Sequence, residues 1–173
     1  MTANLEAFAR TVIVGNGGSG KSWLAERLAA ALSTLAVDLD EIRWLPGGFN
    51  VRREPAAAIE MVRTKATEDQ WVIEGVYGWL ANEALPRATS LIWLDVPIEE
   101  CIANVKARGL RRGGDEAAFM TLIDWVADYA VRTNANSRVA HERAFDAFGG
   151  HRTKITSRAE MAALLNSVGT PGQ

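Results

Sequence analysis

Residues 15–22 read GNGGSGKS, a run in which four glycines fall within six positions and a lysine and a serine follow the last one. Glycines at this spacing let consecutive backbone N–H groups turn inward around an anion, because the backbone adopts positive φ angles and no Cβ fills the space. The lysine and serine add a cation for phosphate oxygens and a hydroxyl for a divalent metal. The segment therefore predicts a loop that binds a nucleotide polyphosphate.

The run fits the P-loop pattern G-x-x-x-x-G-K-[ST] (Walker A) without a mismatch. We expect Lys21 to contact the β and γ phosphates of ATP and the Ser22 hydroxyl to ligate Mg²⁺. A dinucleotide-type G-x-G-x-x-G pattern overlaps the same glycines but leaves Lys21 and Ser22 unexplained. The predicted nucleotide-binding residues of this loop are Gly15, Asn16, Gly17, Gly18, Ser19, Gly20, Lys21 and Ser22.

Short apolar runs and helix-forming segments alternate along the chain, which predicts a doubly wound α/β domain with the P-loop between a buried strand and a helix. Helices are expected from Gly20 to Leu32, after Pro97, and from near Asp115 to Phe148, the last with a break at 133–137. Ser157 with a glutamate three residues later predicts the cap of a final helix. Strands are expected at 11–14, 35–40, 71–75, 90–97 and 152–156.

The chain of 173 residues fits one domain, here 1–173, and its composition, 48% hydrophobic and 23% charged, is that of a globular protein. A net charge of −2 and a pI near 5.7 offer no general attraction for nucleic acid or anionic membrane. One cysteine cannot form an internal disulfide, and no apolar run has the length of a membrane span. We therefore expect a cytoplasmic monomer or homodimer with neither membrane nor nucleic acid as a partner.

The motifs and their order resemble the small P-loop kinases of the adenylate-kinase-like group, and most closely the FlaR-related proteins, known as DNA topology modulation proteins. The segments that carry the resemblance are VGNGGSGKS, DLDEIRWLPGGF, WVIEGVY, LIWLDVPIEEC and KARGLRRGG. It implies a three-layer fold with a five-stranded parallel sheet in the order 2-3-1-4-5, an acceptor-binding insertion over 41–70 and a lid over 107–115. The implied enzyme is a transferase that moves the γ-phosphate of ATP, with Mg²⁺, to a nucleoside-like, nucleotide-like or similar small acceptor.

The resemblance also places acids at strand ends. Asp40 stands where the group carries an acid near the transferred phosphoryl group, so it is the candidate to orient or deprotonate an acceptor hydroxyl. Asp38 is a candidate substrate-binding residue, and the D-x-D spacing also resembles shikimate-type and gluconate-type kinases. The alternative for both acids is an Asp turn with a helix N-cap. Asp95 is expected to cap the helix that follows it.

Glu74 ends the third expected strand, where adenylate kinases carry the aspartate of DGFPR beside Mg²⁺. A carboxylate that ends a buried strand is costly to desolvate unless it meets a cation, so Glu74 is a candidate metal ligand or substrate contact. The alternative is a carboxylate at the rim of the sheet. This chain has Gly78 where that motif has its arginine, so the clamp for an acceptor monophosphate is missing.

Arginines behind the fourth strand match a short closing lid, in which a guanidinium neutralises charge at the γ-phosphate. Arg108 and Arg112 are the preferred catalytic pair and Arg111 a nucleotide contact, whereas the alternative is the solvated end of a helix. In the insertion, Trp44 and Arg52 are candidates to bind the acceptor. The resemblance places adenine between the lid and the loop near residues 156–158.

Two other classes stay open from the sequence. The DNA topology label of the FlaR-related proteins suggests an ATP-binding regulatory protein without phosphotransfer, and an ATPase that drives a partner is a third option. The acidic pI and the lack of a basic stripe argue against DNA contact. Asp40 together with Glu74 argues for chemistry, so phosphotransfer is the function that we expect.

Overall fold

The computed structural model describes residues 5–47, 51–110 and 114–169. A five-stranded parallel sheet forms its centre in the order β2-β3-β1-β4-β5, which confirms the expected topology. The elements, in chain order, are η1 (Leu5–Phe8), β1 (Arg10–Gly15), α1 (Lys21–Ala31), β2 (Ala36–Asp38), α2 (Leu39–Arg43), α3 (Pro55–Lys65), β3 (Trp71–Gly75), α4 (Gly78–Ala84), η2 (Leu85–Arg87), β4 (Ser90–Leu94), α5 (Ile98–Arg108), α6 (Glu116–Ala127), η3 (Asp128–Ala130), α7 (Arg138–Ala147), β5 (His151–Ile155) and α8 (Arg158–Val168).

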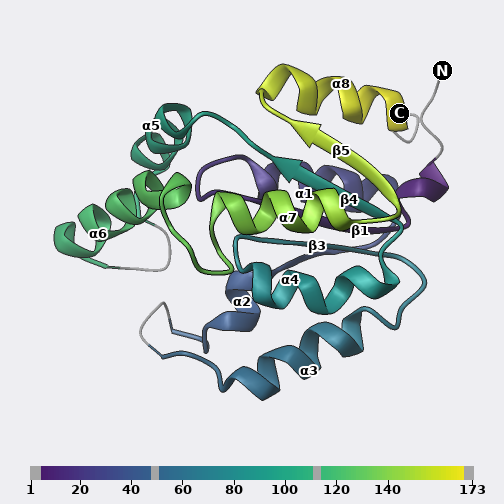
Figure 1. Ribbon diagram of the computed structural model, residues 1–173, viewed down its shortest axis with the longest axis horizontal. Coiled ribbons are helices and arrows are strands. Elements are labelled where there is room, and N and C mark those ends of the chain that lie inside the picture. Colours follow the sequence, from purple (N-terminus) through teal and green to yellow (C-terminus); the bar gives the residue numbers. More distant parts are fainter. Residues whose placement is uncertain (1–4, 48–50, 111–113, 170–173) are drawn as a thin grey trace.

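Two apolar clusters hold the sheet between helices. Side chains alternate across a strand, so Val12 and Val14 of β1 face one cluster while Ile13 faces the other. The Ile13 cluster packs against α1, α5 and α8, and the other against α2, α3 and α4. Figure 1 shows α8 on one side of the sheet and α3 and α4 on the other, as the expected three-layer fold requires.

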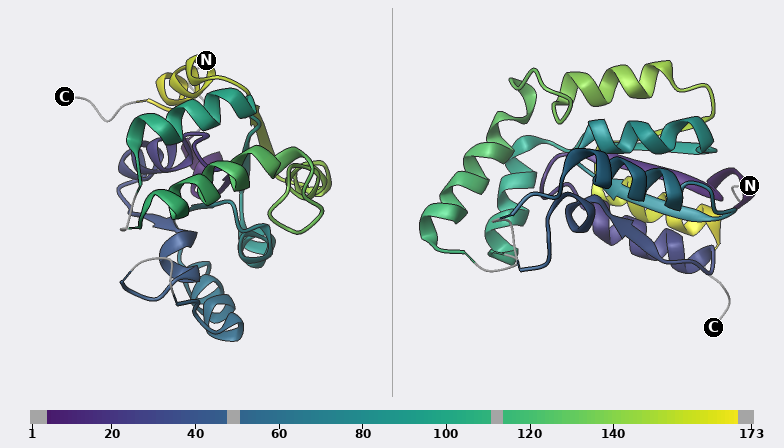
Figure 2. Two further views of the ribbon diagram at one scale, coloured as in Figure 1. Left: turned by 90° about the vertical axis from the view of Figure 1, so that its left-hand side faces the viewer. Right: turned by 90° about the horizontal axis from the view of Figure 1, so that it is seen from below.

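Helices α5 and α6 lie beyond the carboxyl ends of the strands (Figure 1). Seen from that end, they lie side by side in front of the sheet (Figure 2, left). The P-loop leaves β1 at the same end, because it follows Gly15 directly. An open parallel sheet binds its ligands at the carboxyl ends of its strands. The P-loop therefore lies at the edge of the sheet where a ligand site is expected.

The expected long helix over 115–148 is interrupted. Helix α6 ends at Ala127, η3 adds one short turn, and α7 starts only at Arg138, where Ser137 caps it by accepting a hydrogen bond from Ala140 N at 3.2 Å. The break at 133–137 is thus confirmed. The predicted cap by Ser157 is confirmed as well, since its hydroxyl accepts from Glu160 N at 3.3 Å.

No helix in the described ranges combines the length and the apolar character that crossing a membrane requires. The roles of 41–70 and 107–115 remain predictions. Arg111 and Arg112 lie outside the described residues, and with them the centre of the expected lid.

Candidate active site

The loop between β1 and α1 has the backbone that the motif predicts. Gly18 has φ +75° and Gly20 has φ +94°, values that only glycine adopts without strain. A Cβ on Gly18 would overlap the carbonyl oxygen of Cys101, so the loop also packs too closely on α5 for any larger residue. The glycines are therefore required by the fold as well as by a ligand.

Side chains from the loop and from α5 fix its shape. Asn16, which is fully buried, donates from Nδ2 to Val126 O at 2.9 Å and accepts from Gly17 N at 2.8 Å. Asn104 on α5 donates from Nδ2 to Gly18 O at 2.9 Å. The loop is thus tied to α5 and α6, the two helices next to the expected lid.

The loop presents donors toward its interior. Helix α1 begins at Lys21 with no side-chain cap, so its first N–H groups are free to bind an anion. Lys21 is 9% exposed, and its Nζ donates to Asn16 O at 2.7 Å across the loop. These features fit a polyphosphate cradle that helix dipole and lysine together make positive.

Ser22 and Glu74 meet as the two expected metal-binding residues. The Ser22 hydroxyl donates to Glu74 Oε1 at 2.6 Å, and Glu74 is 3% exposed. Burial raises the pKa of Glu74 from 4.5 to about 7, Lys21 opposes this shift, and the charges of Asp38 and Asp40 add to it. A carboxylate beside a hydroxyl provides the oxygen ligands that Mg²⁺ prefers.

The acids after β2 lie next to Glu74. Asp38 pairs with Glu74 in the parallel register of β2 and β3. Its Oδ1 accepts from Asp40 N at 2.8 Å and so caps α2, which is the alternative that we described for this aspartate. The cap fixes the first turn of α2 and with it Asp40. The part of the chain that the structure describes has no cluster of three or more His, Cys, Asp and Glu side chains that could hold a metal without further ligands.

Aromatic and basic side chains gather beside Asp40. The Trp44 indole Nε1 donates to the Tyr77 hydroxyl at 2.9 Å. Burial and the nearby charge of Asp40 raise the Tyr77 pKa. The Arg52 guanidinium lies 5.7 Å from the Trp44 ring centroid, and the two residues form an antiparallel bridge. The structure therefore brings together Trp44 and Arg52, two of the four residues predicted to bind the acceptor.

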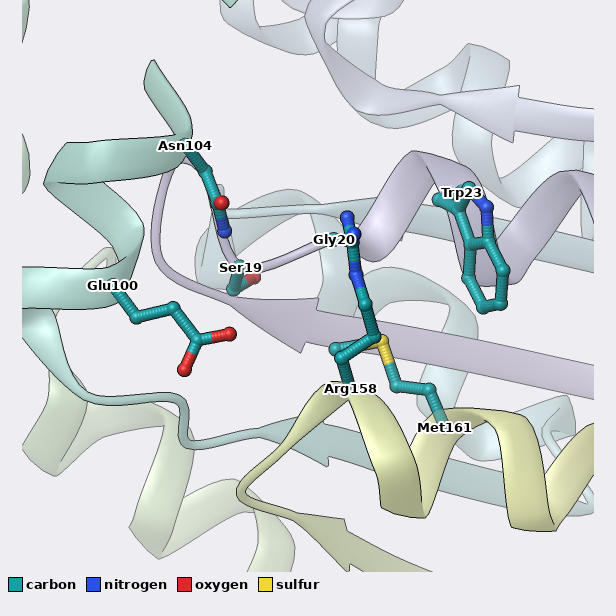
Figure 3. Close-up of a pocket in the computed structure, with 7 residues that line it drawn as sticks. All are labelled: Ser19, Gly20, Trp23, Glu100, Asn104, Arg158 and Met161. Atoms are coloured by element: carbon teal, nitrogen blue, oxygen red, sulfur yellow. The ribbon is translucent and has the colours of Figure 1, made fainter. Parts of the chain in front are cut away.

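A small pocket lies on the α8 side of the P-loop (Figure 3). Arg158 reaches from α8 toward Gly20, and Trp23 of α1 stands next to it. Asn104 and Glu100 line the pocket from α5. The resemblance places the adenine near this region, and that placement stays a prediction.

Arg132 is a residue that the sequence reasoning missed. Its guanidinium nitrogens are all buried and have no hydrogen-bond partner among the described residues. The guanidinium lies 3.9 Å from the Trp125 ring centroid, and Trp125 in turn packs against Gly17 of the P-loop. Burial lowers the pKa of Arg132. An unpaired buried cation one ring away from the phosphate loop is costly in the absence of an anionic ligand.

The expectation about Asp95 has a clear outcome, whereas the one about Arg108 does not. Asp95 does not cap α5, whose N-cap is Pro97; its carboxylate binds Arg138 Nη2 at 2.6 Å and Lys154 Nζ at 2.9 Å. The cap prediction is wrong because the Asp95 carboxylate pairs with two cations from distant parts of the sequence and not with the first N–H groups of α5. Arg108 ends α5, and its catalytic role stays a prediction, as do those of Arg111 and Arg112.

Comparisons with known proteins agree with this geometry. The shikimate kinase of Corynebacterium glutamicum is 32% identical over 148 residues, which cover 73% of this chain and 88% of that protein. No family model matches the chain. A shikimate kinase from Acinetobacter baumannii in complex with shikimate superposes with a TM-score of 0.56 at 16% identity, covering 95% of this chain and 94% of its own.

A gluconokinase from Sinorhizobium meliloti superposes with a TM-score of 0.53 at 11% identity, covering 93% of this chain and 89% of its own. The likeness to these solved structures establishes the fold, and the relative from Corynebacterium establishes the family. The chain belongs to the shikimate kinase-like family of P-loop kinases, phosphotransferases that use ATP and Mg²⁺.

Proposed function

We propose that this kinase transfers the γ-phosphoryl group of ATP to a hydroxyl of a small hydroxylated carboxylic acid, of the shikimate or sugar-acid class. The observation that carries the proposal is the Arg132 guanidinium, which is buried without a hydrogen-bond partner among the described residues and stacks on Trp125 beside the P-loop, while the charge of Asp40 acts on Glu74. Such a cation suits an anionic acceptor, and Asp40 suits a hydroxyl nucleophile. The relatives named above act on acceptors of this chemistry, as their names state.

In this proposal the P-loop amides, the amino end of α1 and Lys21 bind the β and γ phosphates. Ser22 and Glu74 hold Mg²⁺ directly or through its water, and the metal neutralises phosphate charge when bound. Asp40 orients the acceptor hydroxyl or takes its proton as the new P–O bond forms. Catalysis then rests on positioning and on charge already in place, because phosphoryl transfer needs little covalent help from the protein.

The acceptor is held by the side chains around Asp40. Trp44 and Arg52 form one wall, and Asp38 reaches the same edge of the sheet. Arg132 supplies a fixed positive charge for the anionic groups that meet over the P-loop. Lid arginines Arg108, Arg111 and Arg112 complete the set when they close over the phosphates.

A nucleoside monophosphate is disfavoured as the acceptor. Gly78 occupies the position of the arginine that clamps the acceptor phosphate in adenylate kinases, and a Cβ there would overlap the Ala135 carbonyl oxygen. A side chain of any size is therefore excluded. The FlaR-like regulatory role stays an untested alternative; none of the relatives named above belongs to that group.

The test is to incubate the protein with MgATP and, in separate pools, shikimate, gluconate and other hydroxy acids, or nucleosides and nucleoside monophosphates, and to record ³¹P NMR spectra. We expect a new phosphomonoester resonance in an acid pool and none in the nucleoside pools. The Lys21→Ala variant is the matched control for contaminating kinases. Transfer to a nucleoside monophosphate, or release of inorganic phosphate alone from every pool, would contradict the proposal.

A further inference from the structure

A chain of buried hydrogen bonds runs from β4 to the turn that follows β3. Trp93 Nε1 donates to the Tyr129 hydroxyl at 3.3 Å, and that hydroxyl lies 2.7 Å from His141 Nδ1. His141 Nε2 lies 2.9 Å from the carbonyl oxygen of Val76. Tyr129 and His141 are each 1% exposed, so water does not compete for these bonds.

The partners fix the tautomer of the imidazole. The Val76 carbonyl can only accept, so His141 Nε2 carries the proton and donates it. Nδ1 is then the acceptor for the Tyr129 hydroxyl, whose oxygen accepts from Trp93. In this one arrangement, each polar group in the series of hydrogen bonds from Trp93 to Val76 has a partner. Burial also lowers the pKa of His141 to about 4, which keeps the ring neutral at physiological pH.

The turn over 76–78 is held from a second direction. Gly78 packs so closely on the segment between η3 and α7 that a Cβ would overlap the Ala135 carbonyl oxygen and meet His141 Cδ2 at 3.5 Å. The backbone of the turn therefore lies in close contact with both Ala135 and His141. The segment that contacts Gly78 also carries Arg132.

The turn carries Tyr77 into the acceptor side of the site. The Tyr77 hydroxyl accepts from Trp44 Nε1 at 2.9 Å and lies beside Asp40, whose charge acts on it. The Val76 carbonyl belongs to the peptide bond between Val76 and Tyr77. By binding this carbonyl, His141 fixes the backbone from which the Tyr77 side chain extends. A change in that peptide would move the hydroxyl relative to both Trp44 and Asp40.

We propose that His141 is a positioning residue for the acceptor site: by holding the Val76 carbonyl it keeps the Tyr77 hydroxyl in place between Trp44 and Asp40. Its kinetic consequence rests on the proposed function, whereas its structural consequence does not. His141 itself touches no reacting atom in this account. It acts through the turn, as a buried histidine of a fixed tautomer can when both ring nitrogens are paired.

The experiment compares His141→Leu, which removes both polar atoms at similar volume, with His141→Gln, whose amide can still donate to Val76 O. His151→Leu is the matched control, because the second histidine of the chain is exposed on β5. The readout is the indole N–H resonance of Trp44 in ¹H–¹⁵N spectra, assigned by its loss in Trp44→Phe. Tyr77→Phe calibrates the shift that follows loss of the hydroxyl, and the Trp23 resonance, from the other face of the sheet, serves as the internal reference.

We expect His141→Leu to shift the Trp44 resonance about as far as Tyr77→Phe does, His141→Gln to restore it, and the His151 control to leave it unchanged. A Trp44 resonance that stays at its wild-type position in folded His141→Leu overturns the proposal. Two-bond ¹H–¹⁵N spectra of the wild-type imidazoles give a test that needs no variant. They should show the neutral Nε2–H tautomer for His141, and an Nδ1–H tautomer would overturn the proposal even if His141→Leu failed to fold.

Kinetics give the functional part of the test. With the acid acceptor identified by ³¹P NMR, kcat/KM for the acceptor should fall about tenfold or more in His141→Leu, and KM for ATP should stay within about twofold, because only the acceptor side is misplaced. His141→Gln should recover most of the loss. Equal losses for both substrates would overturn the positioning role. A wild-type protein that phosphorylates no acceptor would overturn the proposed function alone, since both NMR readouts are independent of turnover.

Discussion

Glu74→Gln tests the electrostatics of the site most sharply, because the amide copies the protonated carboxyl and can still accept from Ser22 Oγ. Burial raises the pKa of Glu74 from 4.5 to about 7. A group whose pKa is higher in the folded state adds stability below the unfolded pKa, and that stability is lost as the pH rises through the folded value. The wild-type carboxylate should therefore destabilise the ligand-free protein increasingly between about pH 4.5 and 7, whereas the glutamine should not.

The size of the effect follows from the two pKa values. The cost of ionising Glu74 in the folded protein is below ~1 kcal/mol at about pH 5 and ~3 kcal/mol at about pH 8. We expect urea unfolding to find Glu74→Gln more stable than wild type by these amounts at the two pH values. The pKa of His141 is lowered by burial to about 4, so its contribution falls as the pH drops and has the opposite sign. The difference between variant and wild type removes that contribution.

Glu60→Gln is the control for the chemical change itself, since Glu60 is exposed on α3. With saturating MgATP the order should reverse, because only the carboxylate can hold Mg²⁺ or its water. A Glu74→Gln variant whose stability relative to wild type is the same at both pH values would refute the reasoning. It would mean that Lys21 pairs with the carboxylate strongly enough to cancel the burial.

Three further outcomes follow from the packing and charge of the site. Gly18→Ala should destabilise the fold by at least ~3 kcal/mol in urea unfolding, because its Cβ meets the Cys101 carbonyl, whereas Gly109→Ala, also at positive φ but in open space, should cost only about 1–2 kcal/mol. Equal costs would contradict this. Arg132→Met should stabilise the ligand-free protein by about 1–3 kcal/mol, since it removes an unpaired buried cation. The same variant should lower kcat/KM for the acceptor at least about tenfold, while the exposed Arg63→Met changes neither quantity. Loss of stability in Arg132→Met would contradict the expectation that the buried guanidinium is a net cost to the ligand-free fold.

The nucleotide half of the site could be predicted from the sequence because its information is local. Glycines at fixed spacing, a lysine and a serine lie within eight consecutive residues. A short apolar run directly before them indicates the strand, and apolar residues at helical spacing directly after them indicate the helix. Glu74 could be placed by the same reasoning, since it ends an apolar strand next to β1 in the predicted order. The contact between Ser22 and Glu74 then follows from topology.

The acceptor half could be predicted only in part, because its contacts join segments far apart in the chain. The pairing of Trp44 with Arg52 was within reach, as both lie in one insertion. The bond from His141 to Val76 spans 65 residues, and Asp95 meets Arg138 over 43 residues, so no local pattern reveals either. Arg132 lacks a motif of its own; its place one short turn beyond α6, the helix that packs on the P-loop, is the one signal that could have pointed to it.

The central claim is that the inward-facing amides and Lys21 of the P-loop bind the triphosphate of MgATP. Isothermal titration calorimetry of MgATP into the wild-type protein and the Lys21→Ala variant tests it most directly. We predict saturable binding at one site per chain for the wild type and a loss of affinity of at least about tenfold for the variant, because a charge-assisted contact to phosphate is removed. Absence of any binding heat in the wild type across several temperatures, or equal affinity in the two proteins, would contradict the account.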